Sequence, residues 1–330
     1  MKKLPQKNLP SRPRIIFMGT PDFSVPSLEA LVEHGHKVLA VITQPDRPRG
    51  RGKKVVSSPV KLTAIKHGIK VLQPDRVSDK DFCDKILRES PDLFVVVAFG
   101  QILKKRLLEI PSWGCLNIHA SLLPKYRGAA PIQRAIMNNE TITGLTAMRI
   151  EEGLDTGPVI SQEEAPISRD ETFGALHDRL SIISGDFLIK TLRGHAENRL
   201  NEKPQNNSLA TYARKIDKSM SLIKWDQPAK KISAIIRALD PWPGAFTTLN
   251  GKVIKLFSSS VLIENCNDVK PGRVHGHNEE RLLVETGKGI IEIRELQAEG
   301  RKRLPASDFL RGFPIDNGAL FESSKQCPNN

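Results

Sequence analysis

The chain has 330 residues, which exceeds the roughly 100 to 200 residues of one typical domain and predicts two domains. Its 39% hydrophobic and 26% charged residues are ordinary for a globular protein, and no stretch approaches the roughly 18 apolar residues of a membrane span. The net charge of +13 predicts a polyanionic partner, because a basic surface attracts phosphates. Four scattered cysteines without a CxxC pair argue against a disulfide framework or a zinc site and fit a reducing compartment. We therefore expect a cytoplasmic protein without a metal.

The first half of the chain alternates short apolar runs with helical patterns. Strands are expected at 15–18, 38–42, 69–72 and 93–98, and apolar residues recur at helical spacing from Val25 to Val32. The run at 93–98 is apolar throughout, as in a strand buried on both faces. This alternation predicts a Rossmann-like, mainly parallel α/β sheet, whose ligands bind beyond the carboxyl ends of the strands.

The second half predicts a smaller domain of a different kind. A capping box of Ser168 and Glu171 is expected to start a long helix, and a polar stretch without periodicity follows it. A helix at 228–239 and short β-like runs at 253–257, 281–284 and 289–293 then predict a small β-barrel of the OB-like type. The expected organisation is a disordered basic extension at 1–13, a first domain at 14–194, a linker at 195–210 and a C-terminal domain at 211–330.

Two polar segments carry the residues with the most chemical potential. Asn117 and His119 alternate with apolar residues in an expected strand, so they share one face and lie at the strand's end. Asp155 stands between Gly153 and Gly157, which allow positive φ or a close approach of two segments. Taken alone, the first pair could merely satisfy loop backbone, and the aspartate could be an ordinary turn residue.

Together these segments resemble the formyltransferases that use 10-formyltetrahydrofolate, over residues 14 to about 311. The markers are GTPDF at 19–23, QPDRPRGRGKK at 44–54, SPVK at 58–61, NIHASLLPKYRGAAPIQRAI at 117–136, GLDTG at 153–157 and DPWPGA at 240–245. The resemblance implies an enzyme that transfers the formyl group of 10-formyltetrahydrofolate to the α-amino group of methionine on initiator methionyl-tRNA. The products would be N-formylmethionyl-tRNA and tetrahydrofolate.

The resemblance also implies roles for individual residues. The formyl oxygen becomes an anion during transfer, and the Asn117 amide with a protonated His119 would stabilise it by hydrogen bonds. Asp155 would move protons through water or keep His119 charged. The folate-binding loop would consist of Ser121, Leu122, Leu123 and Pro124. Tyr126, Arg127 and Gly128 would either fix that loop or face the substrate.

The segment 44–54 is a basic loop in which prolines and glycines are expected to prevent regular structure. A charge run of this kind can be merely solvated. The resemblance instead implies that it binds the acceptor end of tRNA, and we expect it to become ordered on that partner, with Arg51 in direct contact. The expected tRNA-binding residues are Arg47, Arg49, Arg51, Lys53 and Lys54.

Two other readings stay open. One is a formyltransferase that acts on a sugar or nucleotide amine, although the nucleotide enzymes would leave 211–330 unexplained and the sugar enzymes should lack the basic loop. The other is a catalytically inert tRNA-binding relative, for which Asn117, His119 and Asp155 together would have no chemical reason. We expect a monomer that binds folate and tRNA and no membrane.

Overall fold

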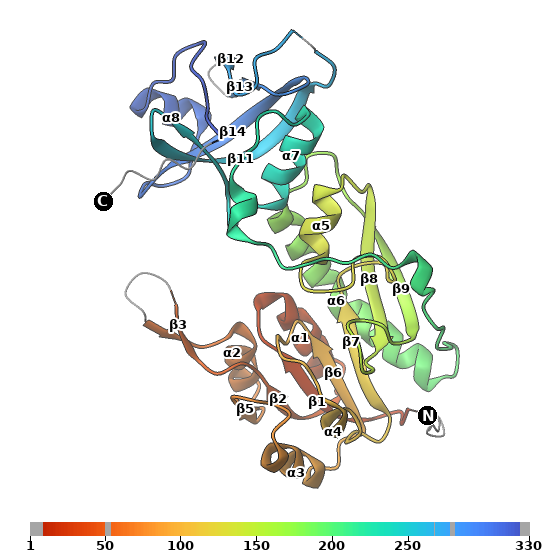
Figure 1. Ribbon diagram of the computed structural model, residues 1–330. Coiled ribbons are helices and arrows are strands. Elements are labelled where there is room, and N and C mark those ends of the chain that lie inside the picture. The colour runs from red at the N-terminus through yellow and green to blue at the C-terminus, as the bar shows by residue number, and fades with distance from the viewer. Residues whose placement is uncertain (1–8, 50–53, 267, 278–280, 324–330) are drawn as a thin grey trace. The chain divides into compact units, whose positions relative to one another are not determined.

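The computed structural model describes residues 9–49, 54–266, 268–277 and 281–323, and these form two compact units (Figure 1). Unit 1 combines 1–128, 143–165 and 177–212, and unit 2 combines 129–142, 166–176 and 213–330, each within the described residues. Two segments from inside the expected first domain, 129–142 and 166–176, thus belong to unit 2. The domain limits at 14–194, 195–210 and 211–330 remain a prediction.

Unit 1 is built on a seven-stranded sheet with the order β5-β2-β1-β6-β7-β8-β9 (Figure 1). β5, β2, β1, β6 and β7 are parallel neighbours, whereas β8 is antiparallel to β7. This confirms the mainly parallel α/β sheet, and each of the four expected strands is present. The strands are β1 (Arg14–Gly19), β2 (Lys37–Ile42), β5 (Val71–Leu72), β6 (Leu93–Val97), β7 (Gly114–His119), β8 (Ile142–Arg149) and β9 (Val159–Pro166).

Both faces of this sheet carry apolar side chains, and helices cover them. Ile16 and Phe94 pack in one cluster with Ile86 and Leu107, which come from α3 and α4. Elsewhere in the unit, α1 and α6 approach closely, since a Cβ at Gly185 would lie 2.9 Å from the Pro26 carbonyl oxygen. The helices are α1 (Val25–Glu33), α2 (Pro59–Lys66), α3 (Lys80–Arg88), α4 (Lys105–Leu108) and α6 (Phe173–Ala196).

The predicted start of the long helix α6 is wrong by one turn. Glu171 does accept a hydrogen bond from the Ser168 amide at 3.0 Å, as in a capping box. The helix nevertheless begins at Phe173, and the hydroxyl that accepts from the first turn is that of Thr172, 3.3 Å from the Ala175 amide. Ser168 and Glu171 form a separate turn, because the Glu171 amide donates to the Ser168 carbonyl. Two possible caps four residues apart made the choice ambiguous from sequence.

The basic loop contains regular structure, contrary to expectation. β3 (Arg47–Arg49) and β4 (Lys54–Val56) form an antiparallel two-stranded hairpin in which Arg49 pairs with Lys54. A proline is tolerated here because each strand of such a hairpin is an edge strand, so an amide can be missing without breaking a ladder. Of the expected tRNA contacts, Arg47 is exposed, whereas Arg51 and Lys53 lie outside the described residues.

Unit 2 contains an antiparallel sheet with the order β10-β11-β14-β13-β12, and β15 pairs with β14. The predicted helix at 228–239 is α7 (Ala229–Ala238), and α5 (Pro131–Met137) packs against it. A separate, antiparallel C-terminal fold is thereby confirmed, while its OB-like closure remains a prediction. The other elements are β10 (Ala245–Leu249), β11 (Lys252–Ile263), β12 (Val274–His277), β13 (Leu282–Glu285), β14 (Ile290–Ala298), β15 (Leu304–Pro305) and α8 (Ala306–Gly312).

Three glutamates of this sheet are held as carboxylates by basic neighbours. Burial alone would raise the pKa of Glu285, but hydrogen bonds from Arg273, the Lys270 amide and His275 lower the pKa below its ordinary value. The pKa values of Glu292 and Glu295 are lowered in the same way against their burial. A carboxyl whose pKa is lower in the folded chain stabilises the fold above its unfolded pKa and loses that contribution as the pH falls.

Unit 2 should therefore lose stability as the pH falls below the ordinary glutamate value of 4.5. Glu285→Gln should lower the melting temperature at pH 6 and flatten its decline between pH 6 and 3, because one titrating group is gone. Differential scanning calorimetry across that range measures both effects. Glu299→Gln, at an exposed position, is the control. An unchanged acid slope in Glu285→Gln would contradict the expectation.

Within the described ranges, the chain has no helix of the length and apolar character needed to cross a membrane.

Candidate active site

The site is organised by the carboxyl end of β7, a strand in the interior of the unit 1 sheet. Asn117 and His119 point to the same face because they alternate with Ile118. The His119 side chain is buried, whereas Asn117 is partly exposed. Among the described residues, the Asn117 carboxamide has no recorded hydrogen-bond partner. The structure thus brings the two predicted residues to one place.

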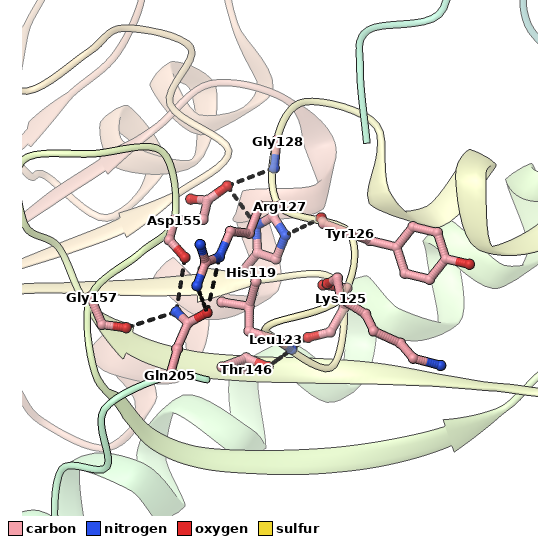
Figure 2. A network of polar contacts seen from close by, with 11 residues as sticks. His119, Leu123, Lys125, Tyr126, Arg127, Gly128, Thr146, Asp155, Gly157 and Gln205 are labelled. Atoms are coloured by element: carbon pink, nitrogen blue, oxygen red, sulfur yellow. Dashed lines mark hydrogen bonds and ion pairs between the residues drawn. The ribbon is translucent and has the colours of Figure 1, made fainter. Parts of the chain in front are cut away.

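His119 connects two loops (Figure 2). Its Nε2 lies 2.9 Å from the Tyr126 carbonyl oxygen, and its Nδ1 lies 3.8 Å from Asp155 Oδ2. A carbonyl oxygen only accepts hydrogen bonds, so Nε2 carries a hydrogen. Nδ1 is therefore the nitrogen at which the ring can gain or lose a proton, and it faces a carboxylate. This places Asp155 beside His119, as the sequence predicted.

Asp155 is fixed by an unusual backbone. Its φ is +53°, in the left-handed region that aspartate tolerates better than most residues. Gly153 has a φ of +136°, and a Cβ at Gly157 would lie 1.9 Å from the Arg149 carbonyl oxygen. One glycine thus provides positive φ and the other a close approach. The Gly128 amide donates to Asp155 Oδ2 at 2.8 Å, which orients the carboxylate toward His119 (Figure 2).

The predicted folate loop divides into residues that hold it and residues that are accessible. Ser121 and Leu123 are buried, whereas Leu122 and Pro124 are partly exposed. The Thr146 hydroxyl donates to the Ser121 carbonyl at 2.6 Å and accepts from the Leu123 amide at 3.1 Å. Ser121 also donates to the Lys125 carbonyl, and the Leu123–Pro124 peptide bond is cis. A ligand could therefore contact Leu122 and Pro124, on a loop that β8 holds through Thr146.

Arg127 and Gln205 form a connection that the sequence did not reveal. The guanidinium of Arg127, which is 2% exposed, donates to Gln205 Oε1 at 2.7 and 3.1 Å. Gln205 Nε2 in turn donates to the carbonyls of Asp155 and Gly157, at 2.8 and 2.7 Å (Figure 2). Of the two roles left open for Arg127, its contacts support fixing the loop. Gln205 lies in the stretch expected to be a linker, where no periodicity or motif singles it out.

Gln205→Ala should destabilise unit 1 by about 2 kcal/mol, because the buried Arg127 guanidinium would lose two hydrogen bonds, keeping the one to Asn207, and two carbonyl oxygens would lose a donor. It should also lower turnover, since the Asp155 turn would lose a support. Urea unfolding and steady-state kinetics measure the two effects. Lys203→Ala is the control, because that neighbouring side chain is exposed. Equal stability of the two variants would contradict the structural role of Gln205.

Cys115 shares the strand of Asn117 and His119, but its thiol is buried. Burial raises the pKa of the Cys115 thiol to about 12, so this residue is not a nucleophile at neutral pH. Over the part of the chain that the structure describes, no group of three or more His, Cys, Asp and Glu could hold a metal ion.

Family comparisons agree with a chain of two parts, a first domain and a separate C-terminal domain. The family described as formyl transferase matches residues 13–192, and the one described as formyl transferase, C-terminal domain, matches residues 215–314. These matches show that the chain is a formyl transferase.

The similarity to curated proteins is closer still. The chain is 49% identical over 304 residues to a methionyl-tRNA formyltransferase of Geobacter metallireducens, covering 92% of this chain and 97% of the relative. It is 44% identical over 308 residues to one of Agathobacter rectalis, covering 93% and 99%. The chain belongs to the methionyl-tRNA formyltransferase family.

Solved structures share the fold at lower identity. A sugar 3N-formyl transferase, crystallised with dTDP and 5-N-formyl-THF, superposes with a TM-score of 0.64 at 23% identity, covering 89% of this chain and all of that one. HypX from Aquifex aeolicus, in complex with tetrahydrofolic acid, gives a TM-score of 0.62 at 19% identity, covering 94% and 51%. These similarities support the two-part architecture. At this identity they do not indicate which substrate the chain uses.

Proposed function

We propose that this chain transfers the formyl group of 10-formyltetrahydrofolate to the α-amino group of methionine on initiator methionyl-tRNA. The observation that carries this proposal is the His119–Asp155 pair beside Asn117 at the sheet edge. The similarity to methionyl-tRNA formyltransferases and the net charge of +13 support the choice of a tRNA substrate. Ser121, Leu122, Leu123 and Pro124 are proposed to form the folate loop. Arg47, Arg49, Arg51, Lys53 and Lys54 are proposed to bind tRNA.

In this reaction the amine nitrogen forms a bond to the formyl carbon, the bond from that carbon to the folate nitrogen breaks, and one proton passes from the amine to the folate nitrogen. Asn117 would donate to the formyl oxygen as its negative charge develops. His119 already uses Nε2–H for the Tyr126 carbonyl, so only Nδ1–H is left for a second donor. Asp155 would favour the charged ring that carries this hydrogen and accept the proton that the amine releases.

Strong activation of the amine is unnecessary in this scheme. An α-amino group titrates near pH 7.7, so on the order of a tenth of it is already neutral at pH 7. The residues therefore need to position the amine, stabilise the oxyanion and move one proton. This fits a site that has one carboxylate and one imidazole and that lacks an activated nucleophile.

A direct assay tests the proposal. The purified chain is incubated with 10-formyltetrahydrofolate and either initiator or elongator methionyl-tRNA, and formylated methionine is measured after hydrolysis of the ester. We expect rapid formylation of the initiator species. A dTDP-linked amino sugar serves as the contrasting acceptor, and faster transfer to that sugar would overturn the tRNA assignment. A monomeric, cytoplasmic enzyme is part of the proposal, and the mass in solution tests the first point.

A further inference from the structure

The direction in which the β3–β4 hairpin points depends on its base, which is the region where the chain enters β3 and leaves β4. Its two strands pair with each other and not with the seven-stranded sheet. Figure 1 shows it projecting from the strands and helices of unit 1 beside α2. Val55 and Val56 are 67% and 43% exposed, so β4 does not rest on a core. The direction of the hairpin must therefore be fixed where it leaves β2 and rejoins the chain before α2.

A single carboxylate joins the segments that meet at this base. Asp46 precedes β3, and Ser57 follows β4 and donates to Asp46 Oδ2 at 3.1 Å. Lys61 of α2 donates to the same oxygen at 2.5 Å, and Gln73 donates to Oδ1 at 2.8 Å. The hydrogen bond from Lys61, followed by that from Gln73, lowers the pKa of Asp46, so the carboxylate remains charged. Three donors thus converge on one side chain.

The base is also tied to the sheet edge that carries the candidate active site. Gln73 Nε2 donates to the Gln44 carbonyl at 2.9 Å as well as to Asp46. Gln44 Nε2 in turn donates to the Phe99 carbonyl at 3.3 Å, and the Thr20 hydroxyl donates to the same oxygen at 2.9 Å. Thr20 follows β1, Gln44 follows β2 and Phe99 follows β6, so all three lie at carboxyl ends of parallel strands.

We propose that Asp46, with Lys61, Gln73 and Ser57, is a positioning clasp that holds the basic hairpin in a fixed direction relative to the active-site edge. This inference rests on the proposed function, because the hairpin carries the expected tRNA contacts. A fixed hairpin holds the aminoacyl end in register with the formyl donor, and small misplacements of a reacting group cost rate steeply. The clasp residues act through the hairpin and do not touch the reacting atoms.

Two variants that remove charges of opposite sign distinguish positioning of the hairpin from simple electrostatic attraction of tRNA. Asp46→Asn removes a negative charge, so simple attraction of tRNA should improve and its KM should fall. Lys61→Met removes a positive charge, so attraction should weaken. Positioning predicts that both variants lose kcat, by about 10-fold at saturating tRNA. In Asp46→Asn the amide offers one acceptor oxygen to three donors, so its NH2 group faces a donor and the clasp opens.

The experiment measures kcat and the KM values for tRNA and folate with initiator methionyl-tRNA. We expect the kcat losses above, an unchanged folate KM, and a kcat within about twofold of wild type in Lys61→Arg, which keeps the charge and the donors. Glu89→Gln is the matched control, because it breaks a Lys–carboxylate pair of 2.7 Å elsewhere in unit 1. Ser57→Ala, which removes one hydrogen bond, replaces Asp46→Asn if that variant does not fold.

Wild-type kcat in Asp46→Asn and Lys61→Met would overturn the clasp while leaving the proposed function intact. A wild-type chain that formylates no methionyl-tRNA would overturn the proposed function instead. A double mutant adds a second criterion: with Arg51→Ala already present, Asp46→Asn should cost little more, because both changes act through the hairpin. A full, additive loss in the double mutant would show that Asp46 supports the fold elsewhere and would also overturn the clasp.

Discussion

Asp155→Asn should lower kcat by roughly 100-fold or more, with little loss of tRNA binding. The asparagine can still accept a hydrogen bond from the Gly128 amide through its oxygen, so the turn should survive. The same oxygen lies 3.8 Å from His119 Nδ1 in the native pair, but in the asparagine it carries no negative charge. The charged imidazole would lose the carboxylate that favours it. Both the second oxyanion donor and the proton acceptor would be lost in one substitution.

Single-turnover kinetics with saturating enzyme measures this loss without interference from product release. The control is Asp178→Asn, because Asp178 pairs with His177 at 2.9 Å on the exposed surface of the same unit. That variant should retain wild-type turnover. An active Asp155→Asn enzyme would remove Asp155 from the chemistry and leave the proton transfer to solvent.

Asn117→Ala should also lower kcat by about 100-fold, because one donor to the developing oxyanion disappears. Asn117→Asp should be worse, since a carboxylate of nearly the same shape would repel the oxyanion. Neither change should disturb the fold, because the native carboxamide bonds to none of the described residues. Steady-state kinetics and thermal unfolding distinguish these effects, with the exposed Asn201→Ala as control. Near-normal turnover of Asn117→Ala would exclude it as an oxyanion donor.

The regular parts of the fold were predictable because local patterns determine them. The residues of β6 and one face of α1 are apolar because they are buried. Buried positions recur with the period of the strand or helix, so the sequence pattern reveals them. Asn117 and His119 could be placed on one face because a strand alternates strictly. The Asp155 turn was visible through its flanking glycines. In each case a few neighbouring residues carried the information.

Three features of the structure were not predictable from the sequence patterns. Gln205 is one of several polar residues in an aperiodic stretch, and only the folded chain shows that it bridges Arg127 to the Asp155 turn. The β3–β4 hairpin was missed because proline and glycine suggested irregular backbone, whereas pairing between two edge strands tolerates Pro48. The capping choice between Ser168 and Thr172 likewise depends on where the helix packs. Gln205 pairs with residues far away in the sequence, whereas the hairpin and the cap involve near neighbours whose pattern was ambiguous.

The packing of α5 against α7 constrains when unit 2 can fold during synthesis of the chain. α5 leaves the ribosome before α7, and its Ile132 and Ile136 are 5% and 1% exposed in the folded chain, where α5 contacts α7. Domains are usually thought to fold one after another as they emerge. Here unit 2 includes the early segment 129–142, so it cannot be completed until α7 has been translated and can contact α5.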